Sequence, residues 1–188
     1  MDEAKALDKK LINSYVGHPN IYIVDNRNEE GFQGKIQRTV DAVCQTVGLP
    51  TQQSHHKKFI LVAEPGNFDI DVPNSVKKEV FEIEEIFLIA TKENTEALLK
   101  KIGKNDSYIY YHEVKTYVEN QRIMKKRQLS ARQYIEMLDQ TAKGFVKVKK
   151  FRQCFTWESQ YFVVETLLNV DQQFSLLRIE SSKAQSQL

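Results

Sequence analysis

The sequence predicts an α+β protein whose main domain is a closed antiparallel eight-stranded β-barrel. From residue 58 onward, apolar residues recur with a period of two, which is typical of β-strands. About eight such runs follow one another, and most of their connections are short. Closing an antiparallel sheet of this size removes its exposed edges, so a barrel is favoured over an open sheet.

The predicted strands lie at 59–63, 80–90, 97–102, 108–118, 123–129, 145–157, 160–168 and 174–180. One helix interrupts them after residue 129. Ser130 is a typical N-cap residue, with Gln133 three residues later as a capping box requires. The apolar face of this helix consists of Ala131, Tyr134, Ile135 and Leu138.

Residues 1–50 have a different pattern, which predicts a helix, a short buried strand and a second helix. The strand is the apolar run Ile21–Val24. The helical spacing is carried first by Ala4, Leu7, Leu11, Ile12 and Tyr15, and then by Phe32, Ile36, Val40, Val43 and Val47. Three such elements cannot bury a core alone, so we expect them to dock on the rest of the chain or on a partner. The predicted divisions are a linker at 51–57, the barrel at 58–180 and a polar tail at 181–188.

The composition describes a water-soluble globular chain, with 28% charged and 41% hydrophobic residues. No apolar run reaches the ~18 residues that a membrane helix needs, and the first residues lack a secretory pattern. Two distant cysteines, Cys44 and Cys154, favour a reducing compartment. We therefore expect a cytoplasmic location, either cytoskeletal or peripheral to a membrane. A net charge of +2 argues against general nucleic-acid binding.

Charged residues two apart share one face of several predicted strands. Such pairs are Glu82 with Glu84, Glu113 with Lys115, Lys150 with Arg152, and Arg178 with Glu180. A barrel lumen that contains both signs would pair its buried charges and attract phosphate. A face exposed to water explains any single pair equally well. The histidines are weaker candidates, because His112 lies in an aromatic strand and His55 and His56 have no metal ligands at suitable spacing.

The chain resembles the family of the TRPL translocation defect protein, whose members join a P-loop kinase-like domain to a CYTH-like (triphosphate tunnel) barrel. The likeness begins in the segments 15–19 and 24–26 and continues with Phe32, Lys35 and Arg38, so residues 1–50 resemble a helix–strand–helix remnant from the end of the P-loop kinase-like domain. It extends through 58–62, 81–84, 108–115 and 127–134, and ends in Lys150, Arg152, 154–155, 160–162 and Leu177 to Glu180.

This resemblance implies a tunnel that binds phosphorylated anions. The positions that match its basic residues are Lys100, Lys115, Arg127, Lys150 and Arg152. The positions that match its acidic residues, and would hold Mg²⁺ or Mn²⁺, are Glu82, Glu84, Glu165 and Glu180. Ile86 stands where the acidic signature has a lysine, and the strand 98–102 has two lysines where arginines are expected.

The sequence also lacks the Gly-x-x-x-x-Gly-Lys-Ser/Thr loop, so it does not contain a complete P-loop nucleotide site. These departures predict a module that binds a phosphoinositide head group or a nucleotide in intracellular trafficking, and does not catalyse a reaction. Two alternatives stay open. One is a structural subunit of a cytoskeletal or ciliary assembly, and the other is a metal-dependent triphosphatase.

Overall fold

The computed structural model describes residues 2–18, 20–24, 31–49, 56–61, 76–118, 121–157, 160–170 and 174–180. The chain forms two compact units. Unit 1 comprises Met1–Lys35, His55–Phe81 and Phe151–Leu188, and unit 2 comprises Ile36–Ser54 and Glu82–Lys150. The predicted linker at 51–57 lies mostly outside the described residues, and the predicted tail at 181–188 lies wholly outside them.

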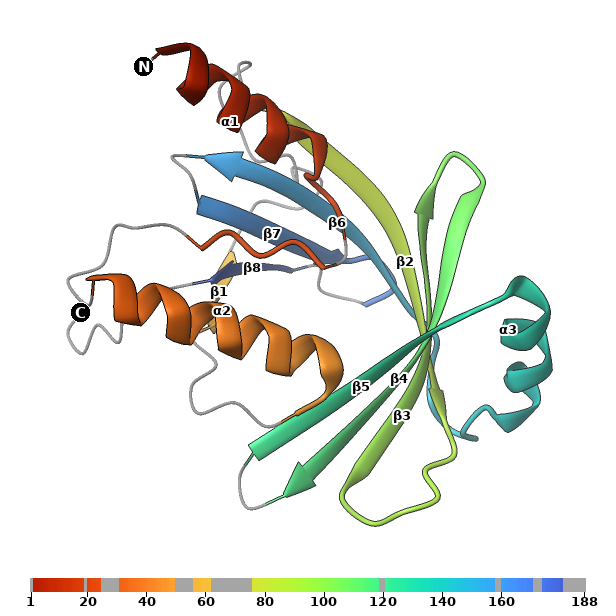
Figure 1. The fold of residues 1–188 in the computed structure, drawn as a ribbon. Helices are drawn as coiled ribbons and strands as arrows, with labels where there is room; N and C mark the ends of the chain where they lie inside the picture. Colours follow the sequence, from red (N-terminus) through yellow and green to blue (C-terminus); the bar gives the residue numbers. More distant parts are fainter. Residues whose placement is uncertain are drawn as a thin grey trace. The chain divides into compact units, whose positions relative to one another are not determined.

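The eight predicted strands are confirmed as one antiparallel sheet, drawn in Figure 1. Its order is β1-β8-β7-β6-β2-β3-β4-β5. Among the described residues, no pairing joins β5 back to β1, so closure into a barrel stays a prediction. The strands are β1 (His56–Leu61), β2 (Lys78–Leu88), β3 (Thr95–Lys104), β4 (Ser107–Val118), β5 (Gln121–Leu129), β6 (Val148–Trp157), β7 (Gln160–Leu167) and β8 (Ser175–Glu180).

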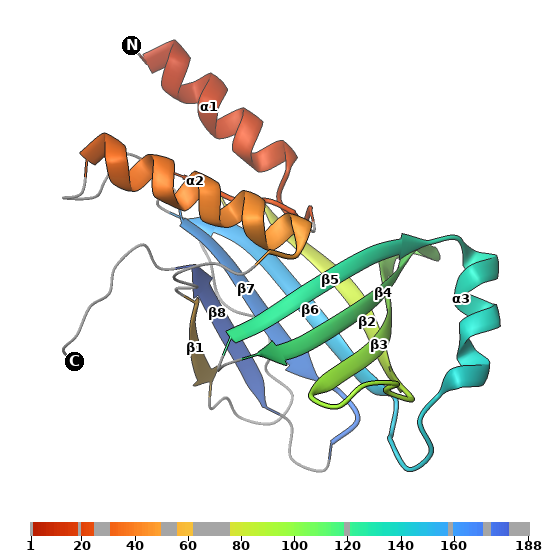
Figure 2. The ribbon, with the colours of Figure 1, turned by 60° about the horizontal axis from the view of Figure 1, so that its bottom comes forward.

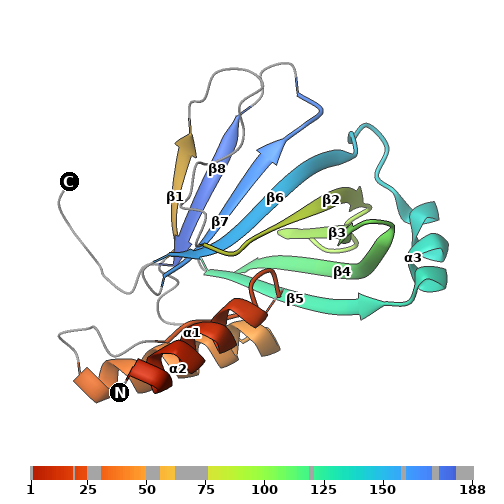
Figure 3. The same cartoon turned by 90° about the horizontal axis from the view of Figure 1, so that it is seen from above.

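In unit 2, β2 to β5 lie side by side, as Figure 3 shows. The register places Glu85 opposite Lys100, and Lys100 opposite Tyr111. Residues directly opposite in antiparallel strands share a face, and neighbours along a strand alternate. One face of the unit therefore contains Glu85, Lys100 and Tyr111, and we call it the Glu85 face. The reverse face contains Glu84 and Lys101, which also lie opposite each other.

The reverse face is partly covered by helix α3 (Ala131–Met137), visible at one end of β4 and β5 in Figure 2. Its predicted capping box is confirmed. The Ser130 hydroxyl accepts from the Gln133 backbone N–H, and the Gln133 side chain accepts from the Ser130 N–H. The core beneath the helix contains Ile86, Leu88, Leu99, Leu129 and Tyr134. This packing buries Ile86 and Leu88 of β2 on the reverse face.

In unit 1, β8 pairs with both β1 and β7, and the chain ahead of the sheet begins with helix α1 (Asp2–Ser14). The predicted strand at 21–24 is wrong, because this segment has no regular secondary structure. Ile21 and Ile23 nevertheless pack against a core of Val16, Cys154, Tyr161 and Val163, with Phe81. Hydrophobic burial there is achieved without a hydrogen-bonded strand partner.

The second predicted helix is confirmed as α2 (Gly31–Val47). Its apolar stripe is exposed in the described part of the chain. The side chains of the stripe are 41% to 76% accessible, and they are Phe32, Ile36, Val40, Val43 and Val47. The expected docking of this stripe on the rest of the chain is therefore not seen. Across the described ranges, no helix combines the length and apolarity needed to cross a membrane.

Candidate functional site

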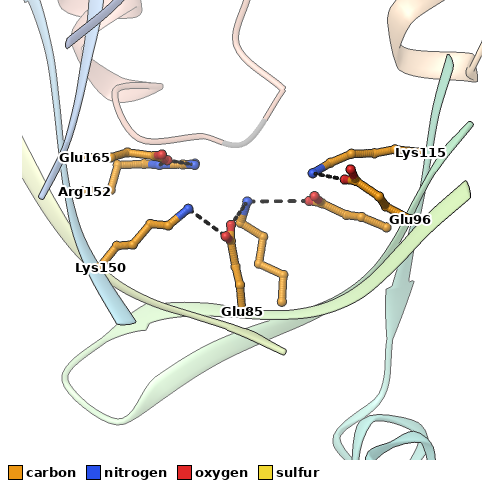
Figure 4. Close-up of polar contacts among 8 residues, drawn as sticks. Glu85, Glu96, Lys115, Lys150, Arg152 and Glu165 are labelled. Atoms are coloured by element: carbon orange, nitrogen blue, oxygen red, sulfur yellow. Dashed lines mark hydrogen bonds and ion pairs between the residues drawn. The ribbon is translucent and has the colours of Figure 1, made fainter. Parts of the chain in front are cut away.

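Four charged side chains on the Glu85 face form one connected ion-pair network, which we call the Glu85 cluster. Glu85 Oε1 lies 3.0 Å from Lys100 Nζ, and Glu85 Oε2 lies 2.6 Å from Lys150 Nζ. Glu113 Oε1 lies 3.7 Å from the same Lys100 Nζ. Figure 4 shows Lys150 directed at the Glu85 carboxylate. Glu85 therefore links two ammonium groups that come from different strands, β3 and β6.

Strand register builds this cluster. Glu85 of β2 faces Lys100 of β3 directly, and Glu113 lies two residues beyond Tyr111, the β4 partner of Lys100. A displacement of two along a neighbouring strand leaves a residue on the same face, within reach of a long side chain. A slip of one residue would move Lys100 to the reverse face, so the cluster also pins the register.

The cluster is largely withdrawn from water. The side chains of Glu85, Glu113, Lys100 and Lys150 retain only 12%, 7%, 11% and 16% of their exposure. Burying an ion costs several kcal/mol unless it is paired, and pairing removes most of that cost. Burial alone would raise the pKa of Glu85, but the two lysine ammonium groups and their hydrogen bonds together hold that pKa below its ordinary value. The carboxylate is thus charged at neutral pH.

A second ion pair lies on the same face. Lys115 Nζ is 3.6 Å from Glu96 Oε2, with Lys115 opposite Glu96 in the register (Figure 4). Beside it, the Lys126 ammonium lies 4.0 Å from the centre of the Tyr111 ring. Because carboxylates and ammonium groups alternate here, the face presents hydrogen-bond donors and acceptors close together. It is not a simple basic patch.

The predicted basic residues are not all brought together. In unit 2, Lys100, Lys115 and Lys150 lie on the Glu85 face. Arg127 lies on the reverse face, because it is opposite His112 rather than Tyr111. Burial and the nearby Arg127 charge lower the pKa of His112, so that imidazole is neutral at pH 7.

The predicted acidic pair Glu82 and Glu84 also lies on the reverse face. Glu82 Oε2 accepts a hydrogen bond of 3.0 Å from the Tyr108 hydroxyl, and Glu84 Oε2 lies 3.3 Å from Lys147 Nζ. The sheet itself separates these carboxylates from Lys100 and Lys115. The carboxylates that accompany the lysines are instead Glu85, Glu96 and Glu113.

In unit 1, the predicted residues Arg152 and Glu165 form their own pair. Arg152 Nε donates to Glu165 Oε1 at 2.8 Å, and an Nη atom of the same guanidinium also contacts that oxygen. Arg152 is two residues from Lys150 along β6, so the two cations share a face of that strand. The Glu180 side chain lies outside what the structure describes.

Sequence reasoning missed Glu85 as a site residue. Glu85 lies on the face of its predicted strand whose other residues are apolar, so it is one carboxylate in an apolar row. Those apolar residues are Phe81, Ile83, Phe87 and Ile89. An isolated charge in an apolar row indicates a buried, paired group more strongly than two neighbouring glutamates do. That contrast was present in the sequence and would have selected Glu85 over Glu82.

A metal could bind near the cluster only by replacing a lysine. The Lys100 ammonium lies between the carboxylates of Glu85 and Glu113, where a bridging divalent cation would lie. Within the described residues, no three His, Cys, Asp or Glu side chains are grouped as metal ligands. The Glu85 cluster therefore does not fit Mg²⁺ or Mn²⁺ while Lys100 is in place. The predicted set of Glu82, Glu84, Glu165 and Glu180 stays a prediction.

Comparisons with known proteins give structural likeness only. No protein-family model matches the chain, and no curated protein matches it. One structure of the inorganic triphosphatase NE1496 has a TM-score of 0.47 and 15% identity, covering 72% of this chain and 77% of that one. A second structure, of the hypothetical protein NE1496, has a TM-score of 0.46 and 16% identity, covering 70% of this chain and 78% of that one. A candidate adenylate cyclase from Vibrio parahaemolyticus has a TM-score of 0.43 and 13% identity, with 71% and 80% covered. Likeness at this level assigns neither family nor activity.

Proposed function

We propose that the Glu85 face binds a small phosphorylated anion without hydrolysing it. The observation that supports this proposal most is the convergence of Lys100 and Lys150 on one buried carboxylate. Glu85 holds both ammonium groups in fixed positions, so a ligand would not have to order two flexible side chains itself. Lys115 supplies a third cation on the same face.

The donors of Lys100 support the same proposal. An ammonium group carries three N–H donors, and the ion pairs of Lys100 with Glu85 Oε1 and Glu113 Oε1 engage two of them. A phosphate oxygen could accept the third without breaking either ion pair. Binding of this kind is charge-assisted, yet the compensating carboxylates would limit its affinity. We therefore expect moderate affinity that weakens as salt is added.

The positions of the acidic residues are the reason why we propose that the bound phosphate is not hydrolysed. Metal-assisted phosphate hydrolysis needs carboxylate-bound metal and phosphate-binding cations on one side of the substrate. Glu82 and Glu84 face away from Lys100. Of the three carboxylates on the Glu85 face, Glu85 and Glu113 have the Lys100 ammonium between them, and Glu96 pairs with Lys115. A triphosphatase would require these groups to rearrange. Phosphate release with added Mn²⁺ is the assay that separates the two functions.

A structural role is supported by a different observation, the exposed apolar stripe of α2. Such a stripe is typical of a helix that packs against a partner. This role and phosphate binding involve different surfaces, so the protein could have both.

Calorimetric titration tests the proposed binding. Inorganic triphosphate, a nucleoside triphosphate and an inositol bisphosphate are titrated separately at 50 mM and 300 mM salt, with and without Mg²⁺. We expect binding that weakens with salt and shows which phosphate source is preferred. Lys150→Met should lower the affinity for every ligand that binds to the wild type. No heat with any of the three at low salt would refute the proposal, and phosphate release in the same samples would refute its non-catalytic part.

A further inference from the structure

Helix α2, drawn in orange in Figure 1, has the reverse of the usual amphipathic arrangement. We call its exposed apolar side the α2 stripe, which consists of Phe32, Ile36, Val40, Val43 and Val47. The less exposed side of the same helix carries small and polar residues, which are Gly34, Arg38, Asp41, Ala42 and Gln45. A helix of a globular protein normally buries its apolar side. An exposed apolar patch of this kind marks an interaction surface.

The C-terminal end of α2 is anchored within unit 2, close to strand β5. Gly48 follows the helix with a φ of +77°, and the Leu49 N–H donates to the Cys44 carbonyl over 2.8 Å, as in a Schellman motif. A Cβ on Gly48 would lie 3.2 Å from the Met124 carbonyl oxygen, so the chain approaches β5 closely at this point. Val47, directly before this anchor, stays exposed. The α2 stripe is thus presented on a helix with a fixed end.

Within unit 2, the spacing of the α2 stripe is the same when it is read from either end. Its apolar positions are four, three and four residues apart, which is the spacing of a seam between two helices. These positions are Ile36, Val40, Val43 and Val47. In an antiparallel pair of copies, Ile36 would lie opposite Val47 of the other copy. Val40 would then lie opposite Val43 of the other copy. A two-fold interface places one patch against itself, and this spacing meets that requirement.

The charges of α2 also favour a second copy as the partner. The charged residues of the helix are Lys35, Arg38 and Asp41, and each lies about 100° or more around the helix from the middle of the α2 stripe. The residues that border the stripe include the uncharged Thr39 and Thr46. Two copies can therefore meet along the stripe without bringing like charges together. An anionic membrane would find no cation on the stripe itself, whereas helices that lie on such membranes carry many.

We propose that α2 pairs with α2 of a second copy of this chain, in an antiparallel two-fold arrangement. The inference rests on the structural role proposed above for the stripe, names its partner, and does not depend on phosphate binding. The exposed fractions of the stripe and of Leu49 amount to roughly 500 Å² of surface per copy. A pair would bury about 1,000 Å² in total, which is the lower limit for a specific interface. We therefore expect a dimer that forms at micromolar concentrations.

Light scattering after size-exclusion chromatography, from about 1 μM to about 100 μM protein, tests the dimer. We expect the wild type to be dimeric at the highest concentration and to dissociate on dilution. Val43→Glu should raise the dissociation constant at least tenfold, because it places a charge in the apolar seam. Leu11→Glu on α1 is the matched control and should leave the dimer unchanged, since Leu11 is 57% exposed and Val43 is 56% exposed. Circular dichroism verifies that both variants fold.

A wild type that stays monomeric at the highest concentration would overturn the proposal. Its sedimentation with phosphatidylserine vesicles would then assign the stripe to a membrane. Equal weakening of the dimer by the two glutamate variants would also overturn the proposal. Because phosphate binding is measured separately by calorimetry, each of these results leaves the proposed phosphate site to its own test.

Disulfide cross-linking tests the antiparallel direction, in a Cys44→Ser background. Val40→Cys protein that carries an affinity tag is mixed with untagged Val43→Cys protein and oxidised. We expect the mixed covalent dimer to form at least tenfold faster than either homodimer, because the two positions face each other across the seam. A mixture of Leu7→Cys and Leu11→Cys on α1, whose leucines are also exposed, is the control and should cross-link slowly. Faster homodimer formation would indicate a parallel pair, and equal rates in the control would show random collision; either result would overturn the proposed arrangement.

Discussion

Replacing Glu85 by glutamine should destabilise the protein and strengthen phosphate binding at the same time. The substitution keeps the shape of the side chain and removes one negative charge between Lys100 and Lys150. Both ammonium groups would then lack their shared counterion while still 11% and 16% exposed. Breaking a buried ion pair costs about 3 to 5 kcal/mol. We expect the low end, about 3 kcal/mol, because Lys100 retains Glu113.

The gain in affinity follows from Coulomb's law. A phosphate oxygen bonded to the far side of the Lys100 ammonium would lie roughly 6 Å from the Glu85 carboxylate. At an effective dielectric constant of ~20, the repulsion between two such charges is about 3 kcal/mol. Screening at physiological salt reduces this energy, so we expect an increase in affinity on the order of tenfold.

The assays are urea unfolding followed by circular dichroism, and calorimetric titration with triphosphate. Glu136→Gln is the control, because its carboxylate pairs with Arg132 on the exposed side of α3 and should change stability by less than about 1 kcal/mol. Equal destabilisation by the two substitutions would contradict the burial argument. A Glu85→Gln protein with weaker phosphate binding would contradict the placement of the ligand beside Lys100.

Four further predictions concern the pH dependence of the Glu85 effect and three other parts of the structure. The stability advantage of the wild type over Glu85→Gln should be present above pH 4.5 and disappear as the pH falls through the lowered pKa of Glu85, in a series of unfolding curves. Thr166→Val should cost about 1 to 3 kcal/mol in urea unfolding by stranding the buried Ser175 hydroxyl, 2.7 Å away, whereas Thr166→Val with Ser175→Ala should recover much of that loss. Ser130→Ala should cost about 1 kcal/mol by removing the α3 cap, measured the same way. Gly103→Ala should lower the melting temperature strongly, because the added Cβ would overlap the backbone oxygen of Ser107.

Most of the sheet could be predicted because its strands carry their pattern locally. The two-residue period located all eight strands, and Ser130 with Gln133 located the start of α3. The segment 21–24 was the exception. Its apolar run fitted a strand, but whether such a run pairs depends on a neighbour that the sequence does not identify.

The candidate site was harder to predict, because its residues are joined by register between strands. Alternation placed Glu82 and Glu84 together on one face of β2. It could not show whether Lys100 of β3 lies on the same side of the sheet as these two glutamates. That choice depends on α3, which buries Ile86 and Leu88 on the side of Glu84. The sequence likewise placed Arg127 among basic residues of one lumen, although its pairing with His112 turns it to the reverse face. Which residues of one strand share a face can be read from the local sequence. Which faces of two different strands lie on the same side of the sheet cannot.

Two neighbouring lysines on β3 provide the most direct test of the central claim that phosphate binds on the Glu85 face. Lys100 lies on that face, whereas Lys101 lies on the reverse face with its ammonium 3.9 Å from the centre of the Tyr108 ring. Calorimetric titration with triphosphate is compared for Lys100→Met and Lys101→Met, after circular dichroism has shown that both fold. Lys100→Met should weaken binding at least tenfold, whereas Lys101→Met should change it by less than about twofold. Equal losses in the two variants, or a larger loss in Lys101→Met, would contradict binding on the Glu85 face.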